Sequence, residues 1–228
     1  MNITISQGRT APPSGAHITI VIDVIRAFTV AHYAFIQGVD RIYLADSKEQ
    51  AFQIKEKYPE YLLAGEVEGY SIDGFNLDNS PYHLKKHNLK NKTLVQKTTN
   101  GVHATLNCLD CDHVFVTGFT NAKRTATYVK EQVNSDTWIH IVASHPSGDD
   151  DLACAEYIKG IIEESSYIKE QEVIKRVKGS HVAEKFFDEN KEVFMPEDID
   201  YCLADINSNF VMKVSKQGEL PMIERVIE

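Results

Sequence analysis

The chain contains few cysteines, no excess of basic residues and no long apolar run. Four cysteines among 228 residues fit reduced thiols better than a disulfide framework. The net charge of -9, from 24 basic and 33 acidic residues, argues against nonspecific nucleic-acid binding, which relies on basic surfaces. No stretch approaches the roughly 20 apolar residues of a membrane span, and residues 1–8 lack the features of a signal peptide. We therefore expect a cytoplasmic protein that binds neither nucleic acid nor membrane.

Several motifs of cofactor-dependent and acyl-transfer enzymes are also missing. The chain has no GxGxxG motif for a dinucleotide, no GxxxxGK(S/T) motif for a nucleoside triphosphate and no GxSxG nucleophile elbow. Cys108 and Cys111 form a CxxC, but no second CxxC completes a zinc set. His83 and His87 have helical spacing, yet the two lysines between them favour a solvated helix face. A disulfide oxidoreductase that uses the CxxC is therefore the last of three functional hypotheses.

The first two-thirds of the sequence alternates between strand-like and helix-like segments. Runs rich in Ile, Val, Leu, Tyr and Phe predict buried strands at residues 18–22, 41–45, 61–64, 93–96, 113–117 and 138–143. Helical patterns predict helices at residues 27–36, 48–58, 102–108, 121–133 and 151–164. This alternation predicts an α/β fold, with a mostly parallel sheet flanked by helices. Because 43% of the residues are hydrophobic and no composition break divides the chain, we expect one domain over residues 1–228.

The C-terminal third has a different character. Residues 163–192 are strongly charged and carry a helical pattern of apolar side chains, among them Tyr167, which predicts peripheral helices packed on the sheet. Pro196 predicts the start of a short helix within residues 194–202. Residues 210–214 predict a further strand. The chain is thus expected to have a helical C-terminal portion with one final strand.

The segment Thr98-Thr99-Asn100-Gly101 joins the strand predicted at residues 93–96 to the helix predicted at residues 102–108. The first N–H groups of a helix have no partner within it and lie at its positive end, which suits an oxyanion such as phosphate. Thr and Asn are also ordinary helix caps, and Gly is an ordinary turn residue. This junction therefore predicts either an anion site or a simple cap. Polar clusters at several other strand ends favour the anion site.

Acidic side chains stand near other predicted strand ends. Asp23 follows the strand at residues 18–22, Arg26 stands beside the next helix, and Glu66 follows the strand at residues 61–64. Asp151 ends an acidic run that precedes a helix. A plain Asp23–Arg26 ion pair and an interaction of the acidic run with the helix dipole are the structural alternatives. If Asp23, Glu66 and Asp151 converge, they predict Mg²⁺, which takes one or two carboxylates plus waters and substrate phosphate.

The chemistry implied by this combination is phosphoryl transfer. Mg²⁺ and Arg26 would neutralise the charge that develops on the phosphoryl group, and either water or a carboxylate would attack in line. The long polar loop over residues 67–81 ends in Asn79-Ser80-Pro81, which is typical of a helix cap with Pro in the first turn. Asn121 follows the strand at residues 113–117. The sequence does not decide between water and a carboxylate as the nucleophile.

Six short motifs, taken in order, resemble the 2-phosphosulfolactate phosphatase (ComB) family. They are Asp23-Val24-Ile25-Arg26-Ala27, Ala64-Gly65-Glu66, Phe75-Asn76-Leu77-Asp78-Asn79-Ser80-Pro81, Thr98-Thr99-Asn100-Gly101, Asn121-Ala122 and Asp150-Asp151. The resemblance covers most of the chain. It implies a magnesium-dependent phosphatase that hydrolyses 2-phosphosulfolactate to sulfolactate and phosphate, in the branch leading to sulfolactate or coenzyme M. It also implies catalytic roles for Asp23, Arg26, Glu66 and Asp151, and substrate contacts for Asn79, Ser80, Thr98, Thr99, Asn100, Gly101 and Asn121.

The chain departs from the family pattern at three points. Val67 stands where family members usually have Arg, FNLDNSP replaces FDLGNSP, and Asp150-Asp151 replaces Glu-Asp. Loss of a guanidinium beside the site would weaken binding of a sulfonate or carboxylate, so a related phosphorylated hydroxy acid is an alternative substrate. The second functional hypothesis is a non-catalytic protein that binds or senses small anions on the same fold. Exposed apolar surface on helices would support a homodimer.

Overall fold

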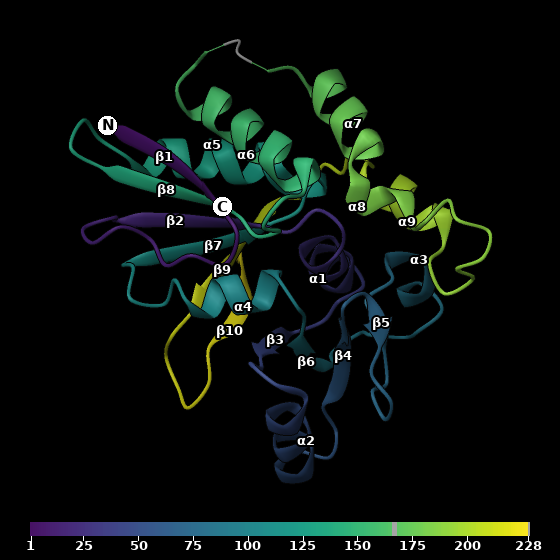
Figure 1. Ribbon diagram of the computed structural model, residues 1–228. Coiled ribbons are helices and arrows are strands. Elements are labelled where there is room, and N and C mark those ends of the chain that lie inside the picture. The colour runs from purple at the N-terminus through teal and green to yellow at the C-terminus, as the bar shows by residue number, and fades with distance from the viewer. Residues whose placement is uncertain (166–167, 228) are drawn as a thin grey trace.

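A central sheet covered by helices forms the protein (Figure 1). The computed structural model describes residues 1–165 and 168–227, so the helical position predicted at Tyr167 lies outside the described residues. The strand order is β1-β8-β2-β7-β9-β10-β3-β6-β4-β5. The sheet is mostly parallel and flanked by helices, which confirms the predicted α/β fold class. Within the described ranges, no helix is long and apolar enough to cross a membrane.

The sheet consists of two parallel blocks joined by an antiparallel hairpin. The first block comprises β1 (Asn2–Gln7), β8 (Trp138–Ala143), β2 (Ile18–Ile22) and β7 (His113–Thr117). The second comprises β3 (Arg41–Leu44), β6 (Thr93–Lys97) and β4 (Leu62–Val67), with the short β5 (Tyr70–Ser71) antiparallel at its edge. The hairpin comprises β9 (Phe210–Ser215), which pairs with β7, and β10 (Met222–Ile227), which pairs with β3. The last strands of the chain therefore lie in the middle of the sheet.

Helices cover both faces of the first block. Ile20 and Ile22 of β2 pack in one core with side chains of α5 (Ala122–Gln132) and α6 (Asp149–Ile162). Val21 packs in a second core with α1 (Ala27–Ile36) and α4 (Gly101–Leu106). Neighbouring residues of a strand point to opposite faces. The unbroken apolar sequence of β2 is thus explained by burial on both sides. In the second block, α2 (Lys48–Lys57) packs against β4 and β6.

The C-terminal third supplies further helices around this sheet. They are α7 (Glu170–Gly179), α8 (His181–Glu184) and α9 (Pro196–Cys202), and α9 packs against the earlier helix α3 (Pro81–Leu84). The predictions of peripheral helices, a helix starting at Pro196 and a strand at residues 210–214 are confirmed. β1 and β10 were not predicted. β1 alternates apolar with polar residues and β10 has Glu224 and Arg225 at its centre, so neither shows the continuous apolar pattern of buried strands such as β2.

Candidate active site

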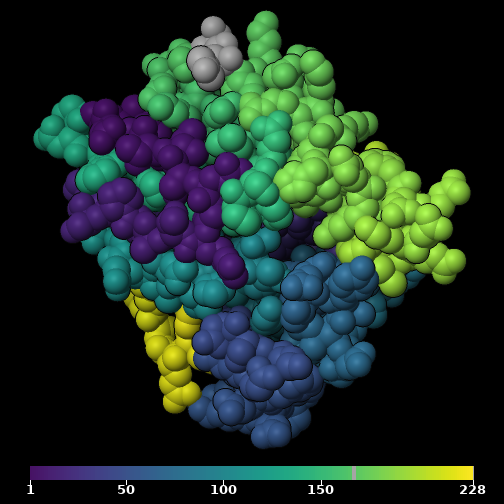
Figure 2. Space-filling model, in the orientation of Figure 1, coloured from purple at the N-terminus to yellow at the C-terminus, as the bar shows by residue number. Residues whose placement is uncertain are grey.

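A cavity of about 370 Å³ lies where residues after β2, within β4 and after β6 meet. Figure 2 shows the surface hollowed where the teal, blue and yellow-green segments adjoin. Residues predicted for the site that line this cavity are Asp23, Arg26, Glu66, Asn79, Thr99 and Asn100. Strand ends far apart in the sequence thus contribute to one site, as expected for an open α/β sheet. We call it the carboxylate cavity.

Asp23 is the buried carboxylate after β2. Its Oδ1 accepts from Ala27 N and its Oδ2 from Gly101 N, each at 2.9 Å. Gly101 allows this close approach, because a Cβ at that position would lie 2.6 Å from Oδ2 of Asp23. Burial raises the pKa of Asp23 to about 7; the bond from Ala27 opposes the rise and the negative charge of Glu66 adds to it. The ionised form of Asp23 is therefore destabilised unless a cation is present.

Glu66 enters the cavity from within β4, which extends to Val67 and does not end at residue 64 as predicted. Its Oε1 accepts from Thr99 N at 2.5 Å, and its Oε2 accepts from Gly69 N at 2.5 Å and from Thr99 Oγ1 at 3.0 Å. Gly65 precedes it with φ +145, and a Cβ there would lie 1.8 Å from Lys97 O, so only glycine fits beside β6. These contacts fix the Glu66 carboxylate.

Arg26 is held by a buried ion pair with Asp198 of α9. Its Nη1 lies 2.6 Å from Asp198 Oδ2, and its guanidinium lies 4.8 Å from the centre of the Phe186 ring. The other oxygen of Asp198, Oδ1, accepts from Ser80 Oγ at 2.7 Å. The alternative of an Asp23–Arg26 ion pair is therefore not realised. Ser80 orients Asp198 and caps α3 by accepting from His83 N at 3.1 Å, and it does not line the cavity.

The helix N-terminus after β6 is occupied by the protein's own side chains. Thr99 N donates to Glu66, Gly101 N donates to Asp23, and Val102 N donates to Thr98 Oγ1 at 3.0 Å. The expectation that these N–H groups point outward unpaired is wrong, because two carboxylates and a hydroxyl beside them accept their hydrogen bonds. Thr98 acts here as a cap of α4. The junction thus orients the two carboxylates through Thr99 and Gly101, while Asn100 lines the cavity.

Asp151 lies outside the carboxylate cavity. Its Oδ1 accepts from Val24 N at 2.8 Å, and its Oδ2 accepts from His145 N at 2.9 Å and Ser144 Oγ at 3.1 Å. It therefore ties the segment after β2 to the segment after β8. Burial, together with the charges of Asp150 and Asp23, raises its pKa well above the usual value.

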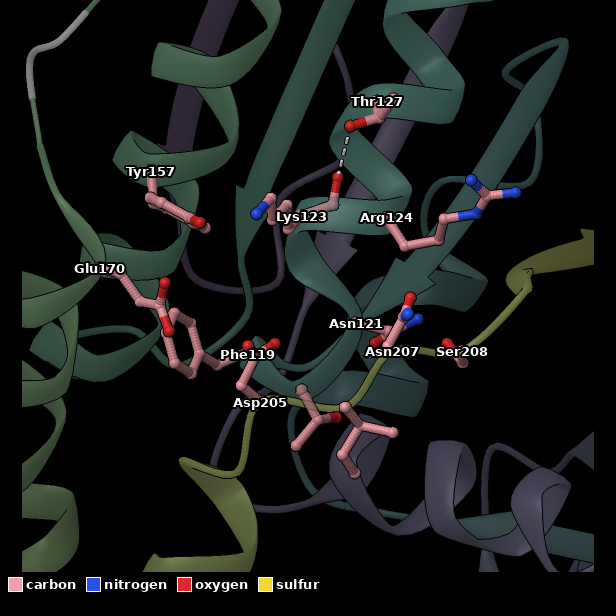
Figure 3. A pocket seen from close by; sticks show the side chains of 12 residues that line it. Phe119, Asn121, Lys123, Arg124, Thr127, Tyr157, Glu170, Asp205, Asn207 and Ser208 are labelled. Carbon is pink, nitrogen blue, oxygen red and sulfur yellow. Dashed lines mark hydrogen bonds between the residues drawn. The ribbon is translucent and has the colours of Figure 1, made fainter.

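Asn121 lies at a second cavity, of about 420 Å³, at the N-terminus of α5 (Figure 3). Its Oδ1 accepts from Thr117 Oγ1 at 2.8 Å. Figure 3 shows it beside Asn207 and Ser208, which come from the segment before β9. The two cavities share no lining residue. The structure therefore does not bring Asn121 to Asp23 and Glu66.

Three basic residues line the carboxylate cavity although no motif singled them out: Arg9 after β1, His145 after β8 and Lys185 after α8. Burial lowers the pKa of Lys185, and the charge of Arg26 adds to the effect. Burial also lowers the pKa of His145. His145 stands two residues after a predicted strand end, so the rule that located Asp23 could have found it. Arg9 follows a strand that was not predicted, and Lys185 lies in a charged helical segment that resembles ordinary surface.

A metal ion in this cavity would rest on two buried carboxylates. Among residues 1–165 and 168–227, no three His, Cys, Asp or Glu side chains are grouped so that they could hold a metal. Both oxygens of Asp23 and Oε1 of Glu66 each accept one hydrogen bond and keep a second lone pair. Mg²⁺ is commonly held by one or two carboxylates, with waters and substrate phosphate completing its shell. The donor set therefore fits Mg²⁺.

The CxxC pair is not a reactive site in this structure. Cys108 and Cys111 are both buried free thiols. Burial raises the pKa of Cys108 to about 12, and Cys111 Sγ donates to Ala16 O at 3.2 Å. Redox thiols instead have lowered pKa values and some exposure. The geometry gives the oxidoreductase hypothesis no support.

The fold and the site define an α/β protein suited to act on a small phosphorylated molecule, with buried carboxylates and basic side chains in one cavity at the strand ends. A family model described as 2-phosphosulpholactate phosphatase matches residues 7–217. The chain belongs to this family, and it is a phosphoric monoester hydrolase. The resemblance seen in the short motifs is thereby confirmed.

Relatives support the assignment over the full length. A protein of Bacillus subtilis (strain 168) is 56% identical over 227 residues, which cover 100% of both chains. One from Clostridium perfringens (strain SM101 / Type A) is 28% identical over 225 residues, covering 92% of this chain and 91% of the relative. One from Caldicellulosiruptor saccharolyticus is 35% identical over 144 residues, covering 60% of this chain and 59% of the relative. Each is named "Probable 2-phosphosulfolactate phosphatase".

Proposed function

We propose that the protein hydrolyses 2-phosphosulfolactate to sulfolactate and phosphate with the help of Mg²⁺. The observation that carries the proposal is that Asp23 and Glu66 share one cavity with Arg26 and Lys185. Two carboxylates alone would repel a phosphate ester. A cation between the carboxylates and the ester would offset this repulsion. The names of the relatives support the substrate. A related phosphorylated hydroxy acid is the alternative substrate.

Asp23 and Glu66 are the residues that would hold Mg²⁺. Asp151 is not part of this pair, because it does not line the cavity. When bound, the metal ion supplies positive charge against the phosphoryl oxygens. Thr99 and Gly69 orient Glu66, and Ala27 and Gly101 orient Asp23. The two carboxylates are thus preorganised by backbone N–H groups.

Basic side chains bind the phosphoryl group in this proposal. Arg26 is immobilised by Asp198 and Phe186, so its guanidinium can form a fork with phosphoryl oxygens without reorganising. Lys185 adds a second positive charge, and an anion beside it would offset the burial that lowers its pKa. His145 Nδ1 accepts from Ser147 N at 3.2 Å, so in the neutral ring Nε2 carries the proton and can donate to a substrate oxygen.

The reaction itself breaks the bond between phosphorus and the ester oxygen. The hydroxyl of a water molecule joins phosphorus, and the remaining proton ends on sulfolactate. Positioning and charge neutralisation are the main contributions a protein makes to phosphoryl transfer. A carboxylate attacking first remains the alternative nucleophile to water.

Phosphate release from 2-phosphosulfolactate, measured with Mg²⁺ and with a chelator, tests the proposal. Wild type should turn over with Mg²⁺, and chelation should abolish turnover. Asp23→Asn should lower kcat/KM by about 10³-fold, because it removes a metal-binding charge. Asp40→Asn changes an exposed acid on another part of the surface and should leave the rate unchanged. Full activity of the purified protein in chelator would refute the magnesium requirement, and no turnover under any condition would refute the substrate.

The remaining expectations stay proposals. A cytoplasmic location is supported by the four cysteines, which are all buried free thiols and suit a reducing compartment. The place in the branch leading to sulfolactate or coenzyme M rests on the family resemblance. The homodimer stays a prediction, which the mass in solution would test.

A further inference from the structure

Arg9 lines the carboxylate cavity from the segment that follows β1. β1 ends at Gln7, and Gly8 then has φ +96 while its N donates to Ala143 O at 2.8 Å. This conformation favours glycine, and it turns the chain as it leaves β1. Arg9 is exposed, whereas Arg26 is buried. The cavity thus has one basic residue at its outer rim and another deep inside.

Helix α4 and the residue that follows it anchor Arg9. Asn107 Nδ2 donates to Arg9 O at 2.7 Å, which fixes the backbone. Arg9 Nη1 lies 3.3 Å from His103 Nδ1 and 3.5 Å from Thr99 O. The same Thr99 donates to Glu66, so Arg9 stands one residue away from a carboxylate of the predicted metal pair. Its position relative to the reacting centre is therefore fixed at both backbone and side chain.

The guanidinium of Arg9 keeps most of its donors available. A guanidinium has five N–H donors in a planar fork. Within the described part of the chain, no carboxylate forms an ion pair with Arg9, although Glu68 lines the same cavity. Arg26 also uses two donors, to Asp198 Oδ2 and, through Nη2, to Gly69 O at 3.2 Å, but its charge is already paired with the Asp198 carboxylate. Arg9 thus differs from Arg26 in carrying a positive charge at the rim that no carboxylate of the described residues pairs with.

The proposed substrate has an anionic group that suits this position. Its sulfonate is carried on a methylene arm, away from the phosphoryl group that the buried Arg26 and Lys185 would bind. A sulfonate offers tetrahedrally arranged oxygens that a guanidinium fork can bind through two hydrogen bonds. We propose that Arg9 binds the sulfonate and thereby sets the preference for a sulfonated substrate. This inference rests on the proposed function, because it assumes the phosphate ester bound in the carboxylate cavity.

Two substrates separate this role from a general effect. We would measure kcat/KM for 2-phosphosulfolactate and for 2-phospholactate, which has a methyl group in place of the sulfonate-bearing arm. Arg9→Gln should lower kcat/KM about 10- to 100-fold on the sulfonated ester and less than about twofold on 2-phospholactate. Arg9→Lys keeps the charge but loses the fork, so it should fall in between. Arg41→Gln, at an exposed residue of β3, is the matched control and should change neither value.

The outcomes distinguish a failure of the Arg9 inference from a failure of the proposed function. An equal loss on both esters would overturn the inference, because Arg9 would then act on a group that both substrates share. No loss on either ester would overturn it as well. Failure of the wild type to hydrolyse the sulfonated ester would overturn the proposed function and this inference with it. A selective loss, with thermal unfolding of Arg9→Gln unchanged, is the result that supports the assignment.

Discussion

The two cavities differ in how their polar side chains are used, although both lie beside strand ends. In the carboxylate cavity, Asp23 and Glu66 come from different strands and are close enough for the charge of one to raise the pKa of the other. In the cavity near α5, the acids Glu170 and Asp205 share the lining with Lys123. Neither of these two acids, both labelled in Figure 3, is buried: Glu170 is half-buried and Asp205 is exposed. A concentration of uncompensated charge is what distinguishes the carboxylate cavity.

The difference extends to the surroundings of each cavity. Near α5, two hydroxyls and a buried ring satisfy one another: His32 Nδ1 lies 2.8 Å from Thr120 Oγ1, and His32 Nε2 lies 3.0 Å from Ser208 Oγ. Around the carboxylate cavity, the bonds hold charged groups in place, as Ser80 holds Asp198 and Asp198 holds Arg26. A polar cluster at a strand end is therefore a site only when its charges are oriented toward a shared volume and remain available to a ligand.

The largest expected effect comes from removing the partner of Arg26. Asp198→Ala would leave a buried guanidinium without its carboxylate and should lower the free energy of unfolding by about 3–5 kcal/mol. Urea unfolding measures this loss, and activity should fall with it because Arg26 is released. Glu219→Gln removes an ion pair with Lys57 that is exposed on both sides, so its effect on the free energy of unfolding should be much smaller. Equal losses of unfolding free energy in the two variants would show that the buried Arg26–Asp198 ion pair matters no more for stability than an exposed one.

A smaller effect is expected from crowding Asp23. In Gly101→Ala, the new Cβ would meet Asp23 Oδ2 at 2.6 Å and Ala27 Cβ at 3.1 Å, so the carboxylate must move. We expect kcat/KM to fall about 10- to 100-fold, the usual cost of disturbing groups that orient metal ligands. The matched variant Gly179→Ala places its Cβ where nothing lies within 4 Å, and should keep full activity. Steady-state kinetics of Gly101→Ala and Gly179→Ala would test this expected difference in kcat/KM.

Beside the cavity near α5, His32 should make the stability of the protein depend on pH. Burial lowers the pKa of His32 to about 4, below its ordinary value near 6.5. Because the folded state disfavours the charged ring, stability is retained above pH 6.5 and lost as the pH falls toward 4. The loss should reach about 2 kcal/mol by pH 5. Urea unfolding at pH 8 and pH 5 should show this extra loss in wild type and in the exposed control His87→Gln, but not in His32→Gln.

The smallest effect is expected at Asn121. If its cavity plays no part in hydrolysis, Asn121→Ala should change kcat/KM for 2-phosphosulfolactate less than about twofold at 25 °C. The variant would lose the hydrogen bond to Thr117, at a cost of about 1 kcal/mol of stability. A large drop in kcat/KM with stability unchanged would contradict the distinction between the cavities.

The fold could be predicted from the sequence where strands are buried on both faces. β2 reads Ile-Thr-Ile-Val-Ile and was predicted at its observed bounds. β1 and β10 were not predicted because the polar residues within them resemble loop sequence when no partner strand is known. Pairing partners are fixed by tertiary structure, which local patterns do not contain. The antiparallel hairpin between the parallel blocks could not be predicted for the same reason.

The site could be predicted in part, through the rule that ligands collect at strand ends. Asp23 and Glu66 follow that rule and lie in one cavity. Asp151 satisfies the same rule, yet it does not line the cavity and instead binds the segments after β2 and β8, and sequence does not reveal those contacts. The substitution at Val67 is also clarified. Val67 follows Glu66 on the strand, so the two side chains point to opposite sides of the sheet. The Val67 side chain is 42% exposed. A missing arginine at that position removes no side chain from the observed cavity lining.

The position of the β9–β10 hairpin also constrains how the protein is made. These strands join the two blocks but are synthesised after the other strands of the sheet. At about 5–20 residues per second, β7 waits roughly 5–20 s after its own synthesis for the partner strand β9. During that time the open edges of β7 and β3 can pair with other chains. A nascent chain therefore passes through an aggregation-prone interval, which ends only when the hairpin fills the gap between the two blocks.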